Sequence, residues 1–347
     1  MSWRSRASIA ALMKPAGAGT VGVYHAIVAL LLPFILSPFP APPADAQTAA
    51  KKVQVATLGS TPIPPPLYEI LRQTLAQLGY PEGQQVGFVQ HHADGEPSRL
   101  PAVADSLLRA KPDVIFVRGQ AAVAAAARAT ATIPIVAVDL ESDPIALGYA
   151  KTLAQPGGNV TGVFLDFPEL SGKQLELLRE IVPGLSRVAL VGDRDGNAAQ
   201  FRAAAQAAQA LGVQTQNFKG RTMVEIEASL EAARRSRAGA VLVFSSPVVF
   251  YNSPRIATLA REKRLASVGV FVEFAEAGGI LTYGPSLRDA YRRCAGYVAK
   301  ILNGAKPAAL PIERPEKFEL VINMKTAKAL GLAVPESLLR RADQILE

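Results

Sequence analysis

Short apolar runs rich in β-branched residues alternate with helical patterns along most of the chain. From Lys51 onward the runs are VQVATLG, QVGFVQ, DVIFVRG and IPIVAVD, separated by helical patterns at about 67–78 and 100–109 and by an Ala-rich stretch. Strands that are apolar along their whole length, with helices between them, are typical of a parallel sheet covered on both faces. This half of the chain therefore predicts a doubly wound α/β lobe.

The same design begins again at Ser186. Its runs are RVALVG, VQTQNF, AVLVFSS and ASVGVF, and the patterns between them predict helices at about 197–211, 224–235 and 256–264. In each half a helical pattern ends at a glycine before the next strand, Gly79 in the first and Gly212 in the second, as expected for a helix C-cap. The fold class is thus α/β, with two doubly wound parallel-sheet lobes.

Three segments are expected to connect these lobes. The turn-rich stretch 155–162 (QPGGNVTG) lies between the two series, and a second crossing is expected near Tyr283-Gly284-Pro285. A further helical pattern at 286–302 and the strand FELVIN remain to be placed; if the helix returns to the first lobe and the strand joins the second, the chain crosses three times and forms a hinge. We expect lobe 1 to comprise residues 51–160 and 285–312, and lobe 2 residues 161–284 and 313–347.

The amino terminus has the outline of a secretory signal peptide. Arg4, Arg6 and Lys14 precede the apolar run AIVALLLPFIL, and Ala44-Asp45-Ala46 supplies small residues where a signal peptidase cleaves. The run is interrupted by proline and is short for the roughly 20 apolar residues of a membrane-spanning helix. We predict that residues 1–46 are a cleaved signal peptide and that the mature protein is periplasmic.

Composition and charge exclude several function classes. Of the 347 residues 49% are apolar and 19% charged, which excludes wholesale disorder. A single cysteine and three histidines exclude a disulfide framework and leave little for a metal site, so no cofactor and no metal are expected. The formal charge of +8 falls to +6 once residues 1–46 are removed, and the basic clusters at 234–237 and 340–341 lie at the ends of helical patterns, where cations complement the helix dipole. No nucleic-acid binding is expected.

Ligand-binding residues are expected where the parallel strands end. The carboxyl ends of such strands, with the helix N-termini that follow them, form the ligand-binding edge of a sheet, and two lobes that face one another enclose a cleft. The candidate ligand-binding residues at this edge and at the hinge are Ser60, Thr61, Asp94, Gly119, Gln120, Ala121, Asp139, Asp193, Ser245, Ser246, Phe271, Glu273 and Tyr283.

These residues offer hydrogen bonding rather than bond breaking. Backbone N–H groups at Gln120 and Ala121, together with serine hydroxyls, suit a carboxylate, whereas Asp139, Asp193 or Glu273 suits an ammonium or hydroxyl group. For each polar residue, the alternative to ligand binding is an ordinary role as a helix N-cap. For each aromatic residue, the alternative is packing in the hydrophobic core. The sequence has no G-x-S-x-G, P-loop or H-E-x-x-H motif, and no G-x-G-x-x-G follows the first strand.

Several segments of the chain form recognisable motifs: PGGNVTG at 156–162, EAGG at 276–279, YGPS at 283–286, and KFELVIN at 317–323 followed by KTAKALGL at 325–332. Together they resemble the ABC-transporter substrate-binding proteins of the family that includes TrpX-like tryptophan-binding proteins. The resemblance extends from about Val53 to Glu347. It implies a type I periplasmic binding protein with a three-segment hinge, which captures a ligand by closure and delivers it to an ABC permease in the inner membrane. The ligand is not implied, because GDRDGN at 192–197 and the prolines at 64–66 depart from the pattern.

We therefore interpret the sequence as an exported solute receptor of an ABC importer, not an enzyme. The small-molecule ligand is expected to be a polar or aromatic carboxylate or an amino-acid-like compound, and the receptor is expected to be a monomer. Two alternatives remain at this point. One is an exported α/β enzyme that acts on a small polar substrate with Asp193 or Glu273 as base, and the other is a periplasmic ligand sensor built from the same lobes.

Overall fold

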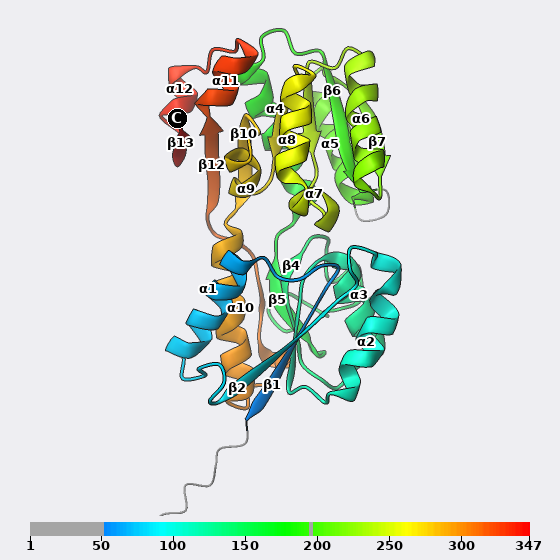
Figure 1. The fold of residues 1–347 in the computed structure, drawn as a ribbon, viewed down its shortest axis with the longest axis vertical. Helices are drawn as coiled ribbons and strands as arrows, with labels where there is room; N and C mark the ends of the chain where they lie inside the picture. The colour runs from blue at the N-terminus through cyan, green and yellow to red at the C-terminus, as the bar shows by residue number, and fades with distance from the viewer. Residues whose placement is uncertain (1–51, 194–196) are drawn as a thin grey trace, which may run out of the picture. The chain divides into compact units, whose positions relative to one another are not determined.

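The computed structural model describes residues 52–193 and 197–347 as two α/β lobes (Figure 1). The predicted signal peptide, residues 1–46, lies outside the described residues. The fold class predicted from the apolar runs is confirmed, with one sheet in each lobe.

The sheet of lobe 1 is parallel throughout. Its strands lie in the order β11-β5-β4-β3-β1-β2. Their bounds are β1 Val53–Gly59, β2 Val86–His92, β3 Val114–Val117, β4 Ile135–Leu140, β5 Val160–Phe164 and β11 Ile312–Glu313. The central strands β3 and β4 are buried along their whole length, as their apolar sequences predict.

Helices cover both faces of this sheet. On one face lie α1 (Pro65–Gln77) and α10 (Leu287–Leu302), whose apolar side chains share a core with one set of strand residues. On the other lie α2 (Leu100–Arg109) and α3 (Gln120–Ala129), which pack on the alternate set. Figure 1 shows α10, from late in the chain, beside α1 from its beginning. The helix predicted at 286–302 thus belongs to lobe 1, where its Cys294 is fully buried.

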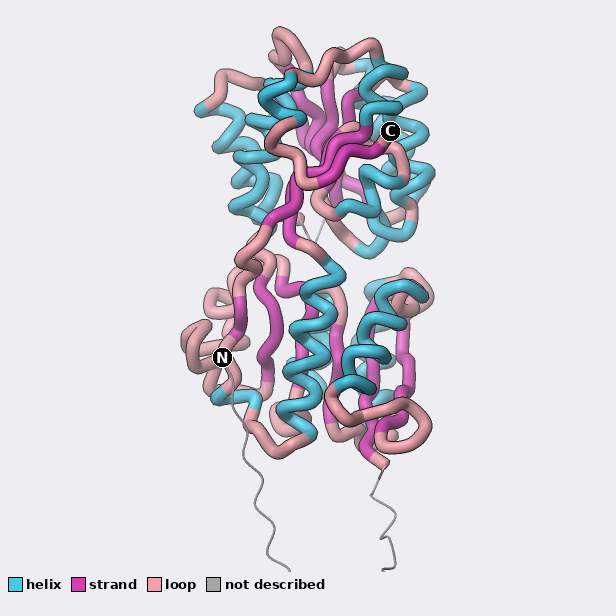
Figure 2. The backbone as a smooth tube through the Cα atoms, turned by 90° about the vertical axis from the view of Figure 1, so that its left-hand side faces the viewer, coloured by secondary structure: helices cyan, strands magenta, loops and turns pink. Residues whose placement is uncertain are grey.

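The sheet of lobe 2 has the strand order β13-β12-β10-β9-β8-β6-β7. Its strands are β6 Arg187–Asp193, β7 Gln214–Gly220, β8 Ala240–Val243, β9 Ala266–Gly269, β10 Leu281–Pro285, β12 Phe318–Asn323 and β13 Gln344–Leu346. Its helices are α4 Phe167–Ile181, α5 Ala198–Ala210, α6 Met223–Arg235, α7 Pro247–Tyr251, α8 Ser253–Glu262, α9 Val272–Glu276, α11 Met324–Leu330 and α12 Glu336–Leu339. In Figure 2 the strands of this lobe lie between helices on either side.

This second sheet departs from the parallel arrangement at one pair of strands. The FELVIN strand, β12, runs antiparallel to β10, and β13 then pairs parallel with β12. The reason is the chain path: β10 ends at a crossing between the lobes, whereas β12 begins at one, so the two neighbours run in opposite directions.

The first crossing comes later in the chain than the boundary expected at residue 160. Strand β5 begins at residue 160 and lies in the lobe 1 sheet between β11 and β4. The chain therefore leaves lobe 1 only after β5, at residues 165–166. Turn formers precede a strand as readily as they form a linker. Here Asn159 donates from Nδ2 to the backbone oxygens of Thr130 (3.0 Å) and Ile133 (2.9 Å), which holds the start of β5 beside β4.

The three crossings are residues 165–166, 286 and 314–317. Arg314 of the third crossing forms an ion pair with Asp166 of the first at 2.9 Å. Next to the crossings, the ring of Tyr283 in β10 stacks on Phe318 of β12 with centroids 6.0 Å apart. The crossings are therefore short, and an ion pair links the first to the third.

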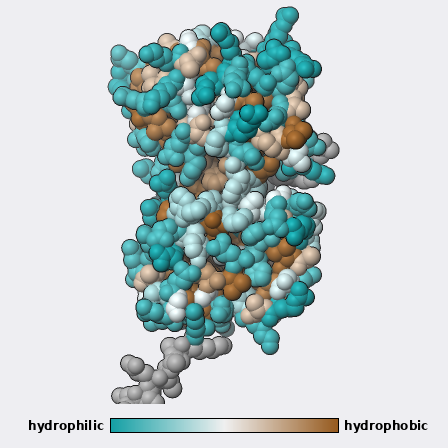
Figure 3. Space-filling model, in the orientation of Figure 1, coloured by the Kyte–Doolittle hydropathy of each residue, from teal (hydrophilic) through white to brown (hydrophobic). Residues whose placement is uncertain are grey.

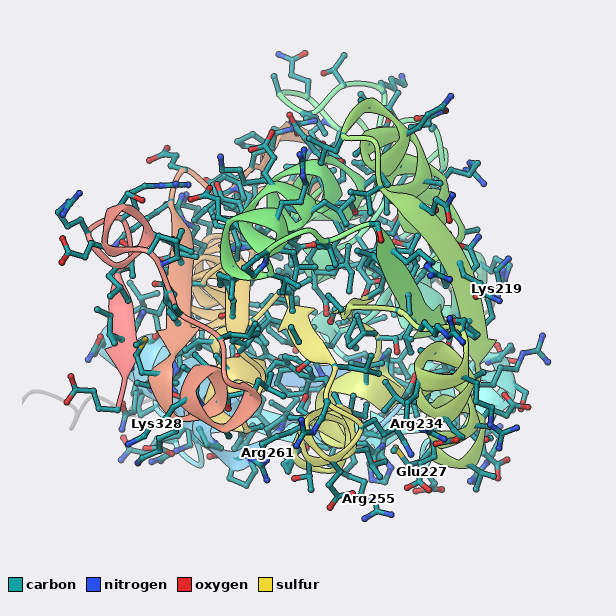
Figure 4. All side chains as sticks on the ribbon, turned by 90° about the horizontal axis from the view of Figure 1, so that it is seen from above. Lys219, Glu227, Arg234, Arg255, Arg261 and Lys328 are labelled. Carbon is teal, nitrogen blue, oxygen red and sulfur yellow. The ribbon has the colours of Figure 1, made fainter. Side chains whose placement is uncertain are left out.

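Polar side chains cover most of the face of the molecule seen in Figure 3, and apolar ones are scattered among them. On the outer side of lobe 2, Arg255 of α8 pairs with Glu227 of α6 at 2.9 Å, and Arg234 pairs with Glu231 at 2.7 Å (Figure 4). The basic cluster at 234–237 is thus partly neutralised by acids of its own helix. No helix within 52–193 or 197–347 is long and apolar enough to span a membrane.

Candidate functional site

A small cavity lies between the two lobes at the carboxyl ends of their strands. It is lined from lobe 1 by Arg118, Gly119, Asp139, Glu141 and Leu287, and from lobe 2 by Ser245, Ser246, Pro247, Phe250 and Phe271. Its volume is about 20 Å³, which is room for roughly one water molecule. An amino-acid-sized ligand therefore enters this site only if the lobes move apart or the side chains rearrange.

A β-bulge near the end of β4 contains the first of the two acidic residues of the cavity, Asp139, and precedes the second, Glu141. From Ala137 to Leu140 strand β4 advances three residues while β5 advances two. Such bulges re-aim side chains at the ends of strands. Opposite the bulge, Gly162 has φ of +143°, and a Cβ there would lie 1.9 Å from the oxygen of Ala137. Only glycine fits at this position, and the local backbone presents Asp139 and Glu141 at the cavity.

Asp139 accepts a hydrogen bond at 2.6 Å from the backbone N–H of Gly119, at the start of α3. Burial raises the pKa of Asp139 to about 7, while the bond from Gly119 and the positive charge of Arg118 oppose this rise. Asp139 thereby fixes the loop between β3 and α3. Gly119 has φ of +86°, and a Cβ there would lie 3.6 Å from Cγ of Pro247 in the other lobe.

Glu141 follows β4 directly and is 7% exposed. Within the described residues it has no hydrogen-bond partner. Burial raises its pKa well above the ordinary value, and the nearby charges of Asp139 and of Asp193, from lobe 2, raise it further. Glu141 is thus a buried carboxyl group that faces other acids.

Arg118, 8% exposed, holds the loop after β1. Its Nη2 donates to the backbone oxygens of Thr61 (2.7 Å) and Pro62 (3.0 Å), and it lies 3.1 Å from Oγ1 of Thr61. Its Nε is buried without a partner. From lobe 2 the ring of Tyr251 covers the guanidinium group at 5.4 Å, and the Tyr251 hydroxyl donates to the oxygen of Pro62. These contacts join the lobes beside the cavity.

The lobe 2 side of the cavity is organised by Asn197, which is fully buried. Its Oδ1 accepts from the backbone N–H of Asp193 at 2.7 Å, and its Nδ2 donates to the backbone oxygen of Ser245 at 2.9 Å. Asn197 therefore ties the end of β6 to the loop after β8. In that loop Ser246 is the N-cap of α7 and accepts from the N–H of Val249 at 3.3 Å, which leaves its hydroxyl hydrogen able to donate elsewhere.

Aromatic rings form the apolar wall of the cavity. Phe271 lies 6.1 Å from Phe250 and 5.7 Å from Phe167, centroid to centroid, and both pairs meet edge to face. Leu287, at the start of α10, completes the wall. The cavity thus combines buried charges on the lobe 1 side with rings on the lobe 2 side.

The structure brings together five of the predicted residues, which line the cavity: Gly119, Asp139, Ser245, Ser246 and Phe271. Asp193 acts on Glu141 electrostatically across the lobes, and Thr61 contacts Arg118. Ser60 is buried at the end of β1, while Gln120 lies near Tyr149 and Ala121 is exposed on α3.

Three other predicted residues lie outside the cavity. Asp94 pairs with His92 (2.9 Å) and Arg99 in a separate hollow of about 400 Å³ on lobe 1. Tyr283 lines a hollow of about 340 Å³ at the crossings. Glu273 lies in α9, where burial raises its pKa. In the part of the chain that the structure describes, no cluster of His, Cys, Asp and Glu could hold a metal ion.

Sequence reasoning did not select the other five residues of the cavity, Arg118, Glu141, Pro247, Phe250 and Leu287. One available signal was a charged residue directly after a fully apolar strand, which applies to Arg118 and Glu141. Pro247, Phe250 and Leu287 carry no such signal, because an apolar residue near the start of a helix is expected to pack in the hydrophobic core.

Comparison with known proteins identifies relatives of this chain and of its fold. A family model described as ABC transporter substrate binding protein matches residues 52–346. The chain is 22% identical over 265 residues to a tyrosine-binding protein of Clostridioides difficile, with 75% of each chain covered. An ABC domain of Streptococcus pneumoniae in complex with L-Trp has a TM-score of 0.77 at 24% identity, with 85% of this chain and 100% of that one covered. A conserved domain protein of Vibrio cholerae has a TM-score of 0.76 at 25% identity, with the same coverage.

Because the family model spans nearly the whole described chain, membership does not depend on any one motif. The segments singled out from the sequence, PGGNVTG at 156–162 and KFELVIN at 317–323, lie within the match. The chain therefore belongs to the ABC transporter substrate-binding protein family.

Proposed function

We propose that this protein is the exported receptor of an ABC importer, which captures an amino-acid-like ligand between its lobes and releases it chemically unchanged. The observation that carries the proposal is the cavity itself: the buried carboxyl group of Glu141 and Nε of Arg118, which is buried without a partner, lie beside a wall of aromatic rings. An amino acid with an apolar or aromatic side chain has all three complementary parts.

Closure of the lobes is the proposed capture step. A cavity of about 20 Å³ cannot admit an amino acid, so the ligand must bind to a more open arrangement. The three short crossings allow a hinge motion, since few backbone torsions need to change. A ligand that touches both lobes then stabilises the closed arrangement by its differential affinity for it.

The location and the partner follow from the same proposal. Residues 1–46 would direct export and be removed, so that the receptor acts in the periplasm as a monomer. The inner-membrane ABC permease would receive the closed, loaded form, in which surface patches of the two lobes have a defined spacing. The relatives support an amino acid as cargo, because one is named for tyrosine and another was crystallised with L-Trp.

A thermal-shift screen of the mature chain tests the proposal. The panel contains the aromatic and aliphatic L-amino acids, their carboxylate analogues and neutral sugars. A ligand at about 100 times its Kd adds roughly 2.7 kcal/mol to the free energy of unfolding, which is readily measured. We expect at least one amino acid to raise the melting temperature and, by small-angle scattering, to reduce the radius of gyration.

The proposal fails if no amino acid or analogue stabilises the protein, or if the bound compound is converted during incubation. Mass spectrometry of the compound recovered after denaturation distinguishes capture from turnover.

A further inference from the structure

One acidic side chain of the cavity, Glu141, receives no hydrogen bond from the residues that the structure describes. Asp139 receives the N–H of Gly119 at 2.6 Å and lies near the charge of Arg118. Glu141, in contrast, has no hydrogen-bond partner within the described residues, although it is 7% exposed and lines the same cavity. A buried carboxyl group that receives no hydrogen bond from the protein takes its donor from water or from a ligand in the cavity, and a ligand donor can replace that water.

The charges around Glu141 define the donor that fits. The groups that act on its carboxyl are both acids, Asp139 on β4 and Asp193 on β6. The titratable groups that face Asp139 in turn are Arg118 and, from α10, Tyr291 and Cys294. Arg118 is the cation of this set, and its Nη2 is already shared among Thr61 and Pro62. An ammonium group, with three donors and a positive charge, complements this surrounding, whereas a carboxylate would meet like charge.

Resting on the proposed function, we propose that Glu141 is the acceptor for the ammonium group of the ligand, and that a primary amine is the indispensable part of the recognised solute. The ligand carboxylate is the secondary part. It would meet Nε of Arg118, which is buried without a partner, but that guanidinium group already satisfies three acceptors. Loss of the amine therefore weakens binding more than loss of the carboxylate.

Proton release accompanies binding if this assignment holds. Because burial and the neighbouring acids raise the pKa of Glu141, the empty cleft retains a proton there at a pH where an exposed glutamate has none. An incoming ammonium group favours the ionised carboxylate, lowers its pKa and displaces the proton. Affinity for an amine consequently rises with pH up to the raised pKa, by at most about tenfold per pH unit for one group.

The experiment compares matched triplets by isothermal titration calorimetry of the mature chain. Each triplet is an amino acid, its decarboxylated amine and its deaminated acid: L-tyrosine, tyramine and 3-(4-hydroxyphenyl)propionate, with the corresponding sets for tryptophan, phenylalanine and leucine. We expect the amino acid to bind best, the amine within about tenfold of it, and the acid at least 100-fold more weakly. Titrations in buffers of different ionisation enthalpy should show protons released at pH values above the ordinary pKa of a glutamate.

Glu141→Gln is the test variant and Glu82→Gln is its control. Glu82 is a carboxylate of lobe 1 that accepts from the hydroxyl of Tyr68 at 2.8 Å and lies outside the cavity. Glu141→Gln should weaken amino acid and amine binding at least tenfold, leave the weak binding of the acid unchanged, and abolish proton release. Glu82→Gln should change none of these, and circular dichroism should show both variants folded.

The possible failures are distinguishable. If the deaminated acid binds as well as the amino acid, or if Glu141→Gln leaves affinity and proton release unchanged, Glu141 is not the ammonium acceptor although the receptor function stands. Tight binding of a neutral sugar without proton release would likewise overturn the assignment. If no member of any triplet binds, the proposed function fails and the inference fails with it.

Discussion

The hydroxyl of Tyr251 offers a direct test of whether ligand binding is coupled to lobe closure. It donates to the backbone oxygen of Pro62 across the cleft, while the ring of the same residue lies over Arg118. Tyr251→Phe keeps the ring and removes only the hydroxyl. Because this hydrogen bond exists only where the lobes meet, its loss should destabilise the closed arrangement and leave the open one unchanged.

The magnitude follows from the exposure of the side chain. A neutral hydrogen bond contributes about 0.5–1.5 kcal/mol, and Tyr251, at 36% exposed, belongs in the lower half of that range because water competes for the same groups. Since about 1.4 kcal/mol corresponds to a tenfold change in Kd, ligand affinity should fall by about twofold to fivefold.

The assay is titration calorimetry of the wild type and the variant with the amino acid that stabilises the protein most in the thermal-shift screen. Tyr80→Phe is the matched control, because the Tyr80 hydroxyl donates to Oδ1 of Asn303 at 2.8 Å within lobe 1 and makes no contact across the cleft. Its Kd should equal that of the wild type. The melting temperature of the ligand-free Tyr251→Phe variant should fall no further than that of Tyr80→Phe.

An unchanged Kd in Tyr251→Phe would refute the coupling, because the contact would then be present in bound and free protein alike. Equal losses of affinity in both tyrosine variants would point to a general effect on stability instead.

Three further substitutions test the construction of the site. Gly162→Ala should lower the free energy of unfolding by more than about 3 kcal/mol in urea denaturation, because a Cβ would lie 1.9 Å from the oxygen of Ala137. A smaller loss of stability would mean that strands β4 and β5 can move apart to make room for the methyl group. Asn197→Ala should lower the free energy of unfolding by about 2 kcal/mol or more, since it leaves buried backbone groups of two loops unpaired. The exposed control Asn303→Ala should lower it by less than about 0.5 kcal/mol. Similar losses of stability in the two variants would contradict the structure. Glu141, with its raised pKa, holds its proton longer in the folded than in the unfolded chain, so its contribution to stability falls as pH rises from about 4, by at most about 1.4 kcal/mol per pH unit. In urea denaturation the Glu141→Gln variant should therefore be more stable than the wild type at pH 8 by at least about 1 kcal/mol, and the two proteins should be equally stable at pH 4. Equal stability at both pH values would show that water hydrates the Glu141 carboxyl group.

The fold was predictable because its strands are buried on both faces. The runs DVIFVRG and IPIVAVD each contain an unbroken apolar segment, VIFV and IPIVAV, and only a sheet covered by helices on either side accommodates such strands. The helix predicted at 100–109 matches α2 residue for residue, since its apolar spacing and flanking breakers agree. The late crossing after β5 was not predictable, because the glycines and asparagine before it suit a turn into a strand as well as a linker.

Half of the cavity was predictable for a similar reason. Asp139 lies near the end of β4 and Ser246 follows β8, and the carboxyl ends of parallel strands converge on one edge. Arg118 and Glu141 hold equivalent positions, but a charged residue after a strand is usually solvated, so sequence alone did not single them out. Tyr283 was expected at the hinge rather than at this edge; it lies beside the crossings and outside the cavity, where it stacks on Phe318.

The amino-acid sequence by itself determined two α/β lobes, their helices and the sheet edge at which the cavity lies, because these depend on local periodicity and on which residues must leave water. Only the tertiary structure decided which ionisable side chains are buried there and which of them receive a hydrogen bond. Burial of Glu141 depends on lobe 2 covering it, and its lack of a donor depends on where Arg118, Asp139 and Asp193 come to lie. Those distances are set by packing between segments far apart in the chain, which no local pattern encodes.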